Sequence, residues 1–160
     1  MMVKSISTVA TCIITLVACN TTNRLTSKNQ KQMFTEEQIK ATLGRVKSGA
    51  DFPVYVQEMK KLGVSHYETF LKDGHSVYYG KNDFQIATSA KFEPIPIADK
   101  VNSQRLKKDI AEHQQGKTDY FEIIRLCAAN GVEKWAVSME KMTCTYFDKS
   151  GDEIWTEEIP

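Results

Sequence analysis

Residues 51–80 read DFPVYVQEMKKLGVSHYETFLKDGHSVYYG, and this stretch decides most of the expected fold. Apolar side chains recur at three- and four-residue steps from Phe52 to Leu62, which is the period of a helix with one buried face. Asp51 can cap the start of this helix, Pro53 is tolerated in its first turn, and Gly63 suits a left-handed residue at its end. The stretch therefore predicts a helix that ends at Gly63.

The residues after this helix favour antiparallel strands. Residues 64–71 alternate and are rich in strand-forming side chains, and Asp73-Gly74 is a strong hairpin signal. Residues 76–79 are expected to form the return strand, and residues 84–88 a third strand. This part of the chain is therefore predicted to be a three-stranded meander.

A second helix is predicted on the N-terminal side. Thr35 and Gln38 have the spacing of a capping box, in which each side chain bonds to the backbone of the other residue. Apolar residues from Ile39 to Val46 give this helix a buried seam. We expect it to end at residues 48–50, just before the helix that starts at Phe52.

The second half of the chain repeats this order of elements. Asp119 corresponds to Asp51, and Gly131 to Gly63, at one offset of 68 residues. The pattern predicts an α+β fold of two helix–helix–three-strand units, residues 33–98 and 99–160, with one or more antiparallel sheets packed on helices. We interpret the repeat as an internal duplication, although any two helix-to-strand junctions share such features. The strands expected in the second unit are residues 132–139, 142–147 and 153–158.

The N-terminus has the features of a bacterial lipoprotein precursor. Lys4 precedes an apolar run from Ile6 to Val17, which is too short to span a bilayer comfortably. The run closes with Leu16-Val-Ala-Cys19, which resembles the lipobox in which the cysteine is acylated and becomes the new N-terminus. We therefore expect a signal peptide at residues 1–18 and a lipid on Cys19.

The residues after Cys19 suit a flexible tether. Residues 19–32 are mostly Thr, Asn, Ser, Gln and Lys, a composition that does not form a packed core. Asn20 follows the cysteine where aspartate would favour the inner membrane, so an outer membrane is favoured if the host has one. The alternatives are an uncleaved membrane anchor or a translation start at Met33.

Composition narrows the possible partners. The chain has 160 residues, of which 41% are hydrophobic and 26% charged, which fits one globular domain with an appendage. Its formal net charge is +1, so no electrostatic argument favours nucleic acid. The four cysteines include no C-x-x-C pair, so no metal site is expected. Whether Cys127 and Cys144 form a disulfide stays open.

No catalytic residues or cofactor are expected from sequence motifs. The chain has no G-x-S-x-G nucleophile motif, no glycine-rich phosphate loop and no H-E-x-x-H metal motif. His66 and His75 are separated along a predicted hairpin, and His113 lies near the end of a predicted helix. We interpret all three histidines as surface or helix-end residues, and we expect a protein that is not an enzyme.

An aromatic group offers one candidate binding face. Tyr67, Tyr78, Tyr79 and Trp135 all fall on predicted strands and could line a groove for a sugar or a peptide. They could equally pack across strands inside the core. The number of residues in the hairpin loop decides whether Tyr78 or Tyr79 shares a face with Tyr67, and the sequence leaves that register open.

Five short segments carry a resemblance to a known family: Phe34-Thr-Glu-Glu-Gln38, Asp51-Phe-Pro53-Val-Tyr55, Leu62-Gly63-Val64, Tyr78-Tyr-Gly80 and Gly131-Val132. Residues 33–160 with these segments resemble the YdfO-like family of small bacterial and prophage proteins, some of which are loosely titled phage envelope proteins. The resemblance implies an α+β fold and no established activity, so no functional residue can be transferred. The lipobox is additional to the usual compact domain of that family.

These observations lead to one functional hypothesis and two alternatives. We expect a membrane-tethered lipoprotein that faces the periplasm or the cell exterior and acts as a non-enzymatic accessory or interaction protein, with an envelope protein as a possible partner. One alternative is a hydrolase or a sugar- or peptide-binding module that uses the aromatic groove near Tyr67 and Tyr78. It requires these rings to be exposed beside a carboxylate such as Glu68. The other is a prophage-encoded envelope or surface-exclusion protein.

Overall fold

Two successive runs of helices and strands make up residues 33–160, which are the residues that the computed structural model describes. The first run is α1 (Glu36–Leu43), the short 3-10 helix η1 (Gly49–Asp51), α2 (Phe52–Leu62), β1 (His66–Phe70), β2 (Ser76–Tyr79) and β3 (Gln85–Ala87). The second run is α3 (Ser103–Gln114), α4 (Tyr120–Ala129), β4 (Lys134–Ser138), β5 (Thr143–Phe147) and β6 (Glu153–Glu158). The predicted α+β class is confirmed, whereas the origin of the two units by duplication stays a prediction. The predicted signal peptide, Cys19 and the tether lie outside the described residues.

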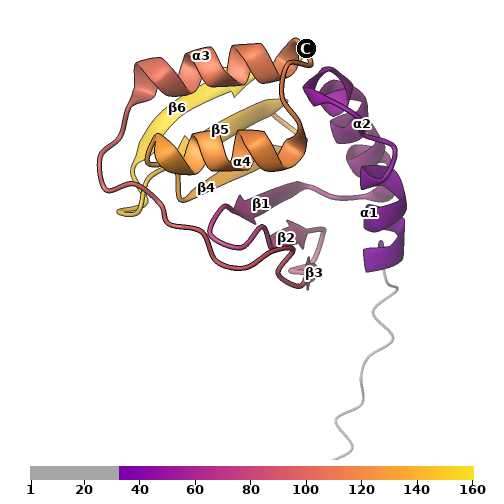
Figure 1. The fold of residues 1–160 in the computed structure, drawn as a ribbon. Helices are drawn as coiled ribbons and strands as arrows, with labels where there is room; N and C mark the ends of the chain where they lie inside the picture. The colour runs from indigo at the N-terminus through magenta and orange to yellow at the C-terminus, as the bar shows by residue number, and fades with distance from the viewer. Residues whose placement is uncertain (1–32) are drawn as a thin grey trace, which may run out of the picture. The chain divides into compact units, whose positions relative to one another are not determined.

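One antiparallel sheet joins the two units. Its strand order is β3-β2-β1-β4-β5-β6, so the units meet where β1 pairs with β4. The helices lie against one face of this sheet, with α4 in front of β4 and β5 in Figure 1. Side chains that alternate along β1 and β4 point to these helices and are buried together with residues of the β1–β2 and β4–β5 connections: Tyr67, Thr69, Leu71, Trp135, Val137 and Met139. These side chains therefore form a core that both units share.

The register of the first hairpin places Tyr78, and not Tyr79, on the face of Tyr67. Tyr67 lies opposite Tyr78 across the β1–β2 pair. The backbone N–H of Phe70 donates to the carbonyl oxygen of His75 at 3.0 Å, so the turn between these two residues contains four residues. Because successive side chains alternate between faces, Tyr79 lies on the face turned away from the helices.

The helix ends agree only in part with the predictions. The capping box of α1 is present, since the N–H of Gln38 donates to the Thr35 hydroxyl at 3.2 Å and the N–H of Thr35 donates to the Gln38 side chain at 2.8 Å. However, α1 ends at Leu43 with Gly44 as its C-cap, so the prediction that it continues to residues 48–50 is wrong.

Asp51 does not cap α2, which corrects a second prediction. Its carboxylate accepts hydrogen bonds from the backbone N–H groups of Lys47 and Ser48, at 2.9 and 3.0 Å. These bonds hold the separate turn η1, and they lower the pKa of Asp51. The carboxylate therefore stabilises the start of η1 instead of the start of α2.

The end of α2 gives a direct test of backbone strain. Gly63 has φ +95°, and a Cβ added there would meet nothing within 4 Å. Gly63→Ala is therefore expected to lower the free energy of unfolding by about 1 kcal/mol through the left-handed conformation alone. Gly63→Asn should cost less, because asparagine tolerates this conformation. Urea unfolding of the two variants measures the difference, and equal losses would contradict the explanation.

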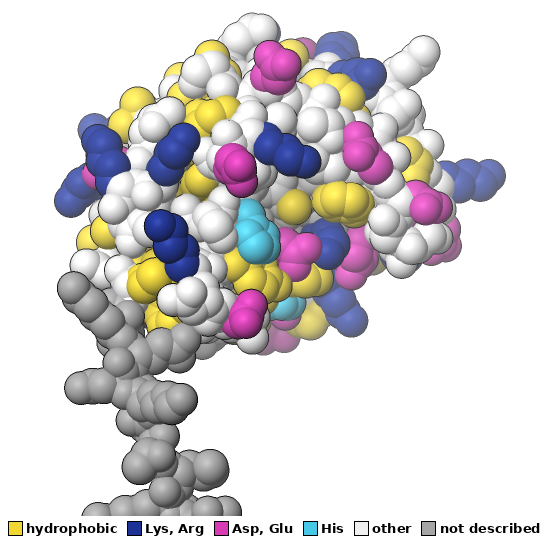
Figure 2. Space-filling model, turned by 180° about the vertical axis from the view of Figure 1, so that it is seen from behind, with side chains coloured by type: hydrophobic (Ala, Val, Ile, Leu, Met, Phe, Trp, Pro, Cys, Tyr) yellow, Lys and Arg dark blue, Asp and Glu magenta, His cyan; other side chains and the backbone are white. Residues whose placement is uncertain are grey.

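The face of the sheet turned away from the helices carries mixed charges. Figure 2, seen from behind Figure 1, shows acidic and basic side chains interspersed, a histidine near the middle and small hydrophobic areas between them. On this face the Tyr79 ring stacks on His66 at 4.2 Å between ring centres. Glu68 accepts hydrogen bonds from the Tyr79 hydroxyl at 3.3 Å and from the Lys134 ammonium at 2.5 Å.

Candidate functional site

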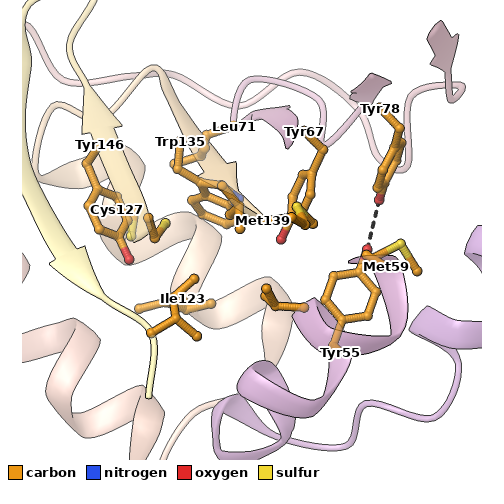
Figure 3. Close-up of a cluster of buried hydrophobic side chains, with 14 of the residues drawn as sticks. Tyr55, Met59, Tyr67, Leu71, Tyr78, Ile123, Cys127, Trp135, Met139 and Tyr146 are labelled. Carbon is orange, nitrogen blue, oxygen red and sulfur yellow. Dashed lines mark hydrogen bonds between the residues drawn. The ribbon is translucent and has the colours of Figure 1, made fainter. Parts of the chain in front are cut away.

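A cavity of about 110 Å³ lies between the helices and the sheet, at the junction of the two units. Its walls come from β1 and β2 of the first unit and from β4, β5 and β6 of the second, with helices on the opposite side. Aromatic side chains from both units line it: Phe52, Tyr55, Tyr67, Tyr78, Tyr120, Trp135 and Tyr146. Figure 3 shows the rings of Tyr146, Trp135, Tyr67 and Tyr78 directed from the strands toward Ile123 and Tyr55 on the helices.

Strand pairing brings these rings together. Tyr67 and Tyr78 are cross-strand partners whose stacked rings lie 5.0 Å apart, and Trp135 and Tyr146 are partners whose rings meet edge to face at 6.3 Å. The pairing of β1 with β4 sets Thr69 opposite Trp135 and thereby places both aromatic pairs on one face. The aromatic wall is therefore assembled from residues about 70 positions apart in the sequence.

Most tyrosine hydroxyls of the cavity have hydrogen-bond partners. The hydroxyls of Tyr55 and Tyr78 bond to each other at 3.1 Å. The Tyr120 hydroxyl accepts from the Lys91 ammonium at 3.3 Å, and the Tyr146 hydroxyl donates to Glu157 at 2.7 Å. These bonds satisfy the polar ends of the rings while their faces remain apolar.

The hydroxyl of Tyr67 and the indole N–H of Trp135 differ, because neither has a hydrogen-bond partner among residues 33–160. Both residues are buried, with exposed fractions of 4% and 8%. Every fully enclosed side-chain nitrogen or oxygen in this part of the chain does have a partner. These two atoms are therefore not fully enclosed, and both residues line the cavity. Burial raises the pKa of Tyr67 well above its usual value, so its hydroxyl stays protonated.

Charged side chains of opposite sign also line the cavity. The Lys91 ammonium lies 5.3 Å from the centre of the Tyr120 ring. Desolvation by the surrounding protein lowers the pKa of Lys91, although the residue as a whole is exposed. Glu157 accepts hydrogen bonds from Tyr146 and from the Gln114 amide, at 2.7 and 2.8 Å. Burial nevertheless raises the pKa of Glu157.

The candidate face predicted from the sequence is divided by the sheet. Tyr67, Tyr78 and Trp135 line the cavity and are packed inside, with no more than 8% of any of them exposed. Tyr79 lies on the other face, next to His66, and so does Glu68. The carboxylate weighed as a partner for the aromatic groove is therefore separated from it by the thickness of the sheet.

Sequence reasoning missed several residues of the cavity. Tyr55 lies within the helical apolar pattern from Phe52 to Leu62, and Tyr120 opens α4, while Tyr146 lies two positions after Cys144 on the same strand face. This alternation was the available signal for Tyr146. No local pattern indicated Lys91, which reaches the cavity from the connection between β3 and α3.

The titratable groups near the cavity do not form an obvious nucleophile or metal centre. Cys144 lines the cavity as a free thiol, and burial raises its pKa, so it stays protonated and weakly nucleophilic. Cys127 is likewise a buried free thiol with a raised pKa. Within residues 33–160 no group of three His, Cys, Asp or Glu side chains is arranged to hold a metal ion.

Among residues 33–160 no helix is long and apolar enough to cross a bilayer.

Comparison with known protein families shows which family the chain belongs to. The profile of the family described as "Protein of unknown function (DUF1398)" matches residues 40–158, which is more than half of the sequence. The chain belongs to this family. The DUF1398 match includes both units and every strand that lines the cavity. It supports an uncharacterised family and does not test the narrower YdfO-like resemblance. None of the curated proteins compared with the chain is significantly similar to it.

Proposed function

We propose that the DUF1398 domain of this chain is a binding module that holds a small organic molecule in the aromatic cavity. The observation that carries this proposal is the hydroxyl of Tyr67, a buried residue that lines the cavity, because this hydroxyl has no hydrogen-bond partner among residues 33–160. Ligand sites are typically concave, lined by apolar and aromatic side chains, and supplied with a few polar groups that orient the ligand. The cavity has all three properties.

A water molecule satisfies only the polar part of the cavity. The Tyr67 hydroxyl and the Trp135 indole N–H can bond to water, but they are set among aromatic faces, which pack best against another ring. An apolar cavity of about 150 Å³ can hold benzene. The present cavity is about 110 Å³, which suits a ligand of about one small ring.

A binding role fits the chemistry better than catalysis. The Cys144 thiol is protonated, and both carboxylate oxygens of Glu157 already accept hydrogen bonds from the protein. Lys91 donates to Tyr120 and lies over its ring. These groups can orient a ligand without any bond being made or broken.

A larger side chain at position 144, which would occupy the cavity, tests the proposal. We expect one-ring compounds such as phenol, benzyl alcohol, benzoate and benzylamine to include at least one ligand that shifts the Trp135 indole N–H signal in NMR spectra. Cys144→Leu should abolish this binding because the larger side chain enters the cavity that Cys144 lines. Unfolding of this variant should differ little from that of the wild type.

Cys127→Leu is the matched control for this experiment. Cys127 is fully buried and does not line the cavity, so leucine there is expected to overpack the core and cost about 1–3 kcal/mol. It should retain ligand binding at temperatures where it is folded. Failure of every compound to bind, or unchanged binding by Cys144→Leu, would show that the cavity is not a ligand site.

We also propose that this module is tethered to a bacterial membrane. The supporting observation is the segment Leu16-Val-Ala-Cys19, which has the residues of a lipobox after an apolar run, followed by a polar stretch at residues 20–32. A lipid on Cys19 would hold the binding module at the periplasmic or outer surface of the envelope. Membrane partition of a Cys19→Ser variant tests this part independently of ligand binding.

A further inference from the structure

We infer that the cavity selects a compact one-ring carboxylate of the benzoate class. This inference rests on the proposed binding function and adds the charge and shape of the ligand. Its basis is that the unused hydrogen-bonding groups of the cavity are mainly donors, with a cation beside them. These donors include the Tyr67 hydroxyl, the Trp135 indole N–H and the Lys91 ammonium, and the Lys47 side chain lines the cavity as a second cation.

The donors require acceptors on the ligand. An indole N–H can only donate, and an ammonium group has three N–H bonds and no acceptor. Lys91 uses one of these bonds on the Tyr120 hydroxyl, so the others are available for a bound group. The Tyr67 hydroxyl is protonated and can donate as well. A carboxylate supplies two acceptor oxygens, and ionic hydrogen bonds are stronger than neutral ones.

The aromatic walls require a flat apolar body. The Tyr120 and Trp135 rings meet edge to face with centres 6.5 Å apart, and Trp135 meets Tyr146 in the same way. Such an arrangement presents both ring faces and ring edges to the cavity, which suits a planar ring. The enclosed volume of about 110 Å³ restricts the body to one ring.

The positions of the charges orient the acid group. Lys91 lies beside Tyr120, which is 39% exposed and so belongs to the rim of the cavity. Glu157 belongs to β6, whereas Lys91 follows the opposite edge strand β3. Both oxygens of Glu157 accept hydrogen bonds from the protein, and the negative charge of Glu157 repels an anion near β6. The ligand carboxylate is therefore expected between Lys91 and the Tyr67 hydroxyl, with the ring packed against the aromatic walls.

Three ligands of similar size separate the possible recognition modes. Sodium benzoate, benzyl alcohol and benzylamine carry a negative, a neutral and a positive group on the same ring. At neutral pH we expect benzoate to bind the wild-type protein about tenfold more tightly than benzyl alcohol, and benzylamine to bind most weakly. Titrations followed by the NMR signal of the Trp135 indole N–H give the three dissociation constants.

Three variants locate the preference. Lys91→Gln should remove the preference for benzoate over benzyl alcohol, whereas Lys91→Arg should retain it. Tyr67→Phe keeps the ring and removes the unpaired hydroxyl, so it should weaken benzoate binding about tenfold. The matched controls are Lys107→Gln, a lysine over the Trp155 ring outside the cavity, and Tyr79→Phe on the other face of the sheet. Both controls should bind benzoate like the wild type.

The outcomes distinguish this inference from the function on which it rests. Equal binding of benzoate and benzyl alcohol, a preference for benzylamine, or unchanged selectivity in Lys91→Gln would overturn the carboxylate class while leaving a ligand cavity. Failure of all three compounds, and of phenol, to bind would overturn both the class and the proposed function.

Discussion

Replacing Cys19 by serine is expected to move the protein from the membrane fraction to the soluble fraction. Serine lacks the thiol that carries the lipid in the proposed lipoprotein. Each buried methylene of an acyl chain contributes about 0.8 kcal/mol, so several chains together anchor a protein firmly without a spanning helix. Detergent-phase partitioning and intact mass of the protein from host membranes measure the effect: the wild type should start at acylated Cys19, and the variant should lack the lipid mass.

Cys12→Ser is the matched control, because Cys12 lies within the apolar run and outside the segment from Leu16 to Cys19. It should leave the partition and the mature mass unchanged. A wild-type protein that starts at Met1 or Met33 and stays in the aqueous phase would refute the proposed tether. It would leave the cavity and its ligand tests unaffected, since they depend on residues 33–160.

Removing the Asp109 carboxylate is expected to cost about 2–4 kcal/mol of the free energy of unfolding. Asp109 lies on α3 and is only 1% exposed. One oxygen accepts from the Arg105 guanidinium at 2.8 Å, and the other accepts from the Asn130 amide at 2.8 Å. Asn130 follows α4 and is itself buried, so the carboxylate ties the two helices of the second unit together.

Asp109→Ala would leave the Asn130 amide with only its bond to the Leu126 carbonyl and would leave a small void in the core. Part of Arg105 is solvent-exposed, so its loss of a partner adds little. Urea unfolding measures the effect, with exposed Asp152→Ala as the control. Asp109→Asn keeps the shape and should lose less. A loss under about 1 kcal/mol for Asp109→Ala would contradict the role assigned to this network.

Local sequence patterns predicted most helices and strands. Gly63 ends α2 in the left-handed conformation, and the Thr35 and Gln38 pair starts α1, as their residue types required. Such signals act over three or four residues and need no distant partner. The end of α1 was misplaced because Asp51 bonds back to the N–H groups of Lys47 and Ser48, and so creates η1.

The candidate site was predictable only in part. Aromatic residues on strands indicated Tyr67, Tyr78 and Trp135, all of which line the cavity. Tyr79 has the same residue type and neighbourhood, yet lies on the other face because of a one-residue difference in position. Lys91 could not be predicted, since a loop lysine acquires its place in the cavity only when the loop packs beside Tyr120.

The sequence by itself determined the α+β class, the order of elements in both units and the end of α2 at Gly63. These features depend on periodicity and on local backbone preferences. Only the tertiary structure decided that β1 pairs with β4 and so unites the units in one sheet. That pairing joins residues far apart in the chain, and no local preference specifies it. It also places Tyr67 and Trp135 on one face of the sheet, where both line the cavity and neither polar atom has a hydrogen-bond partner among residues 33–160.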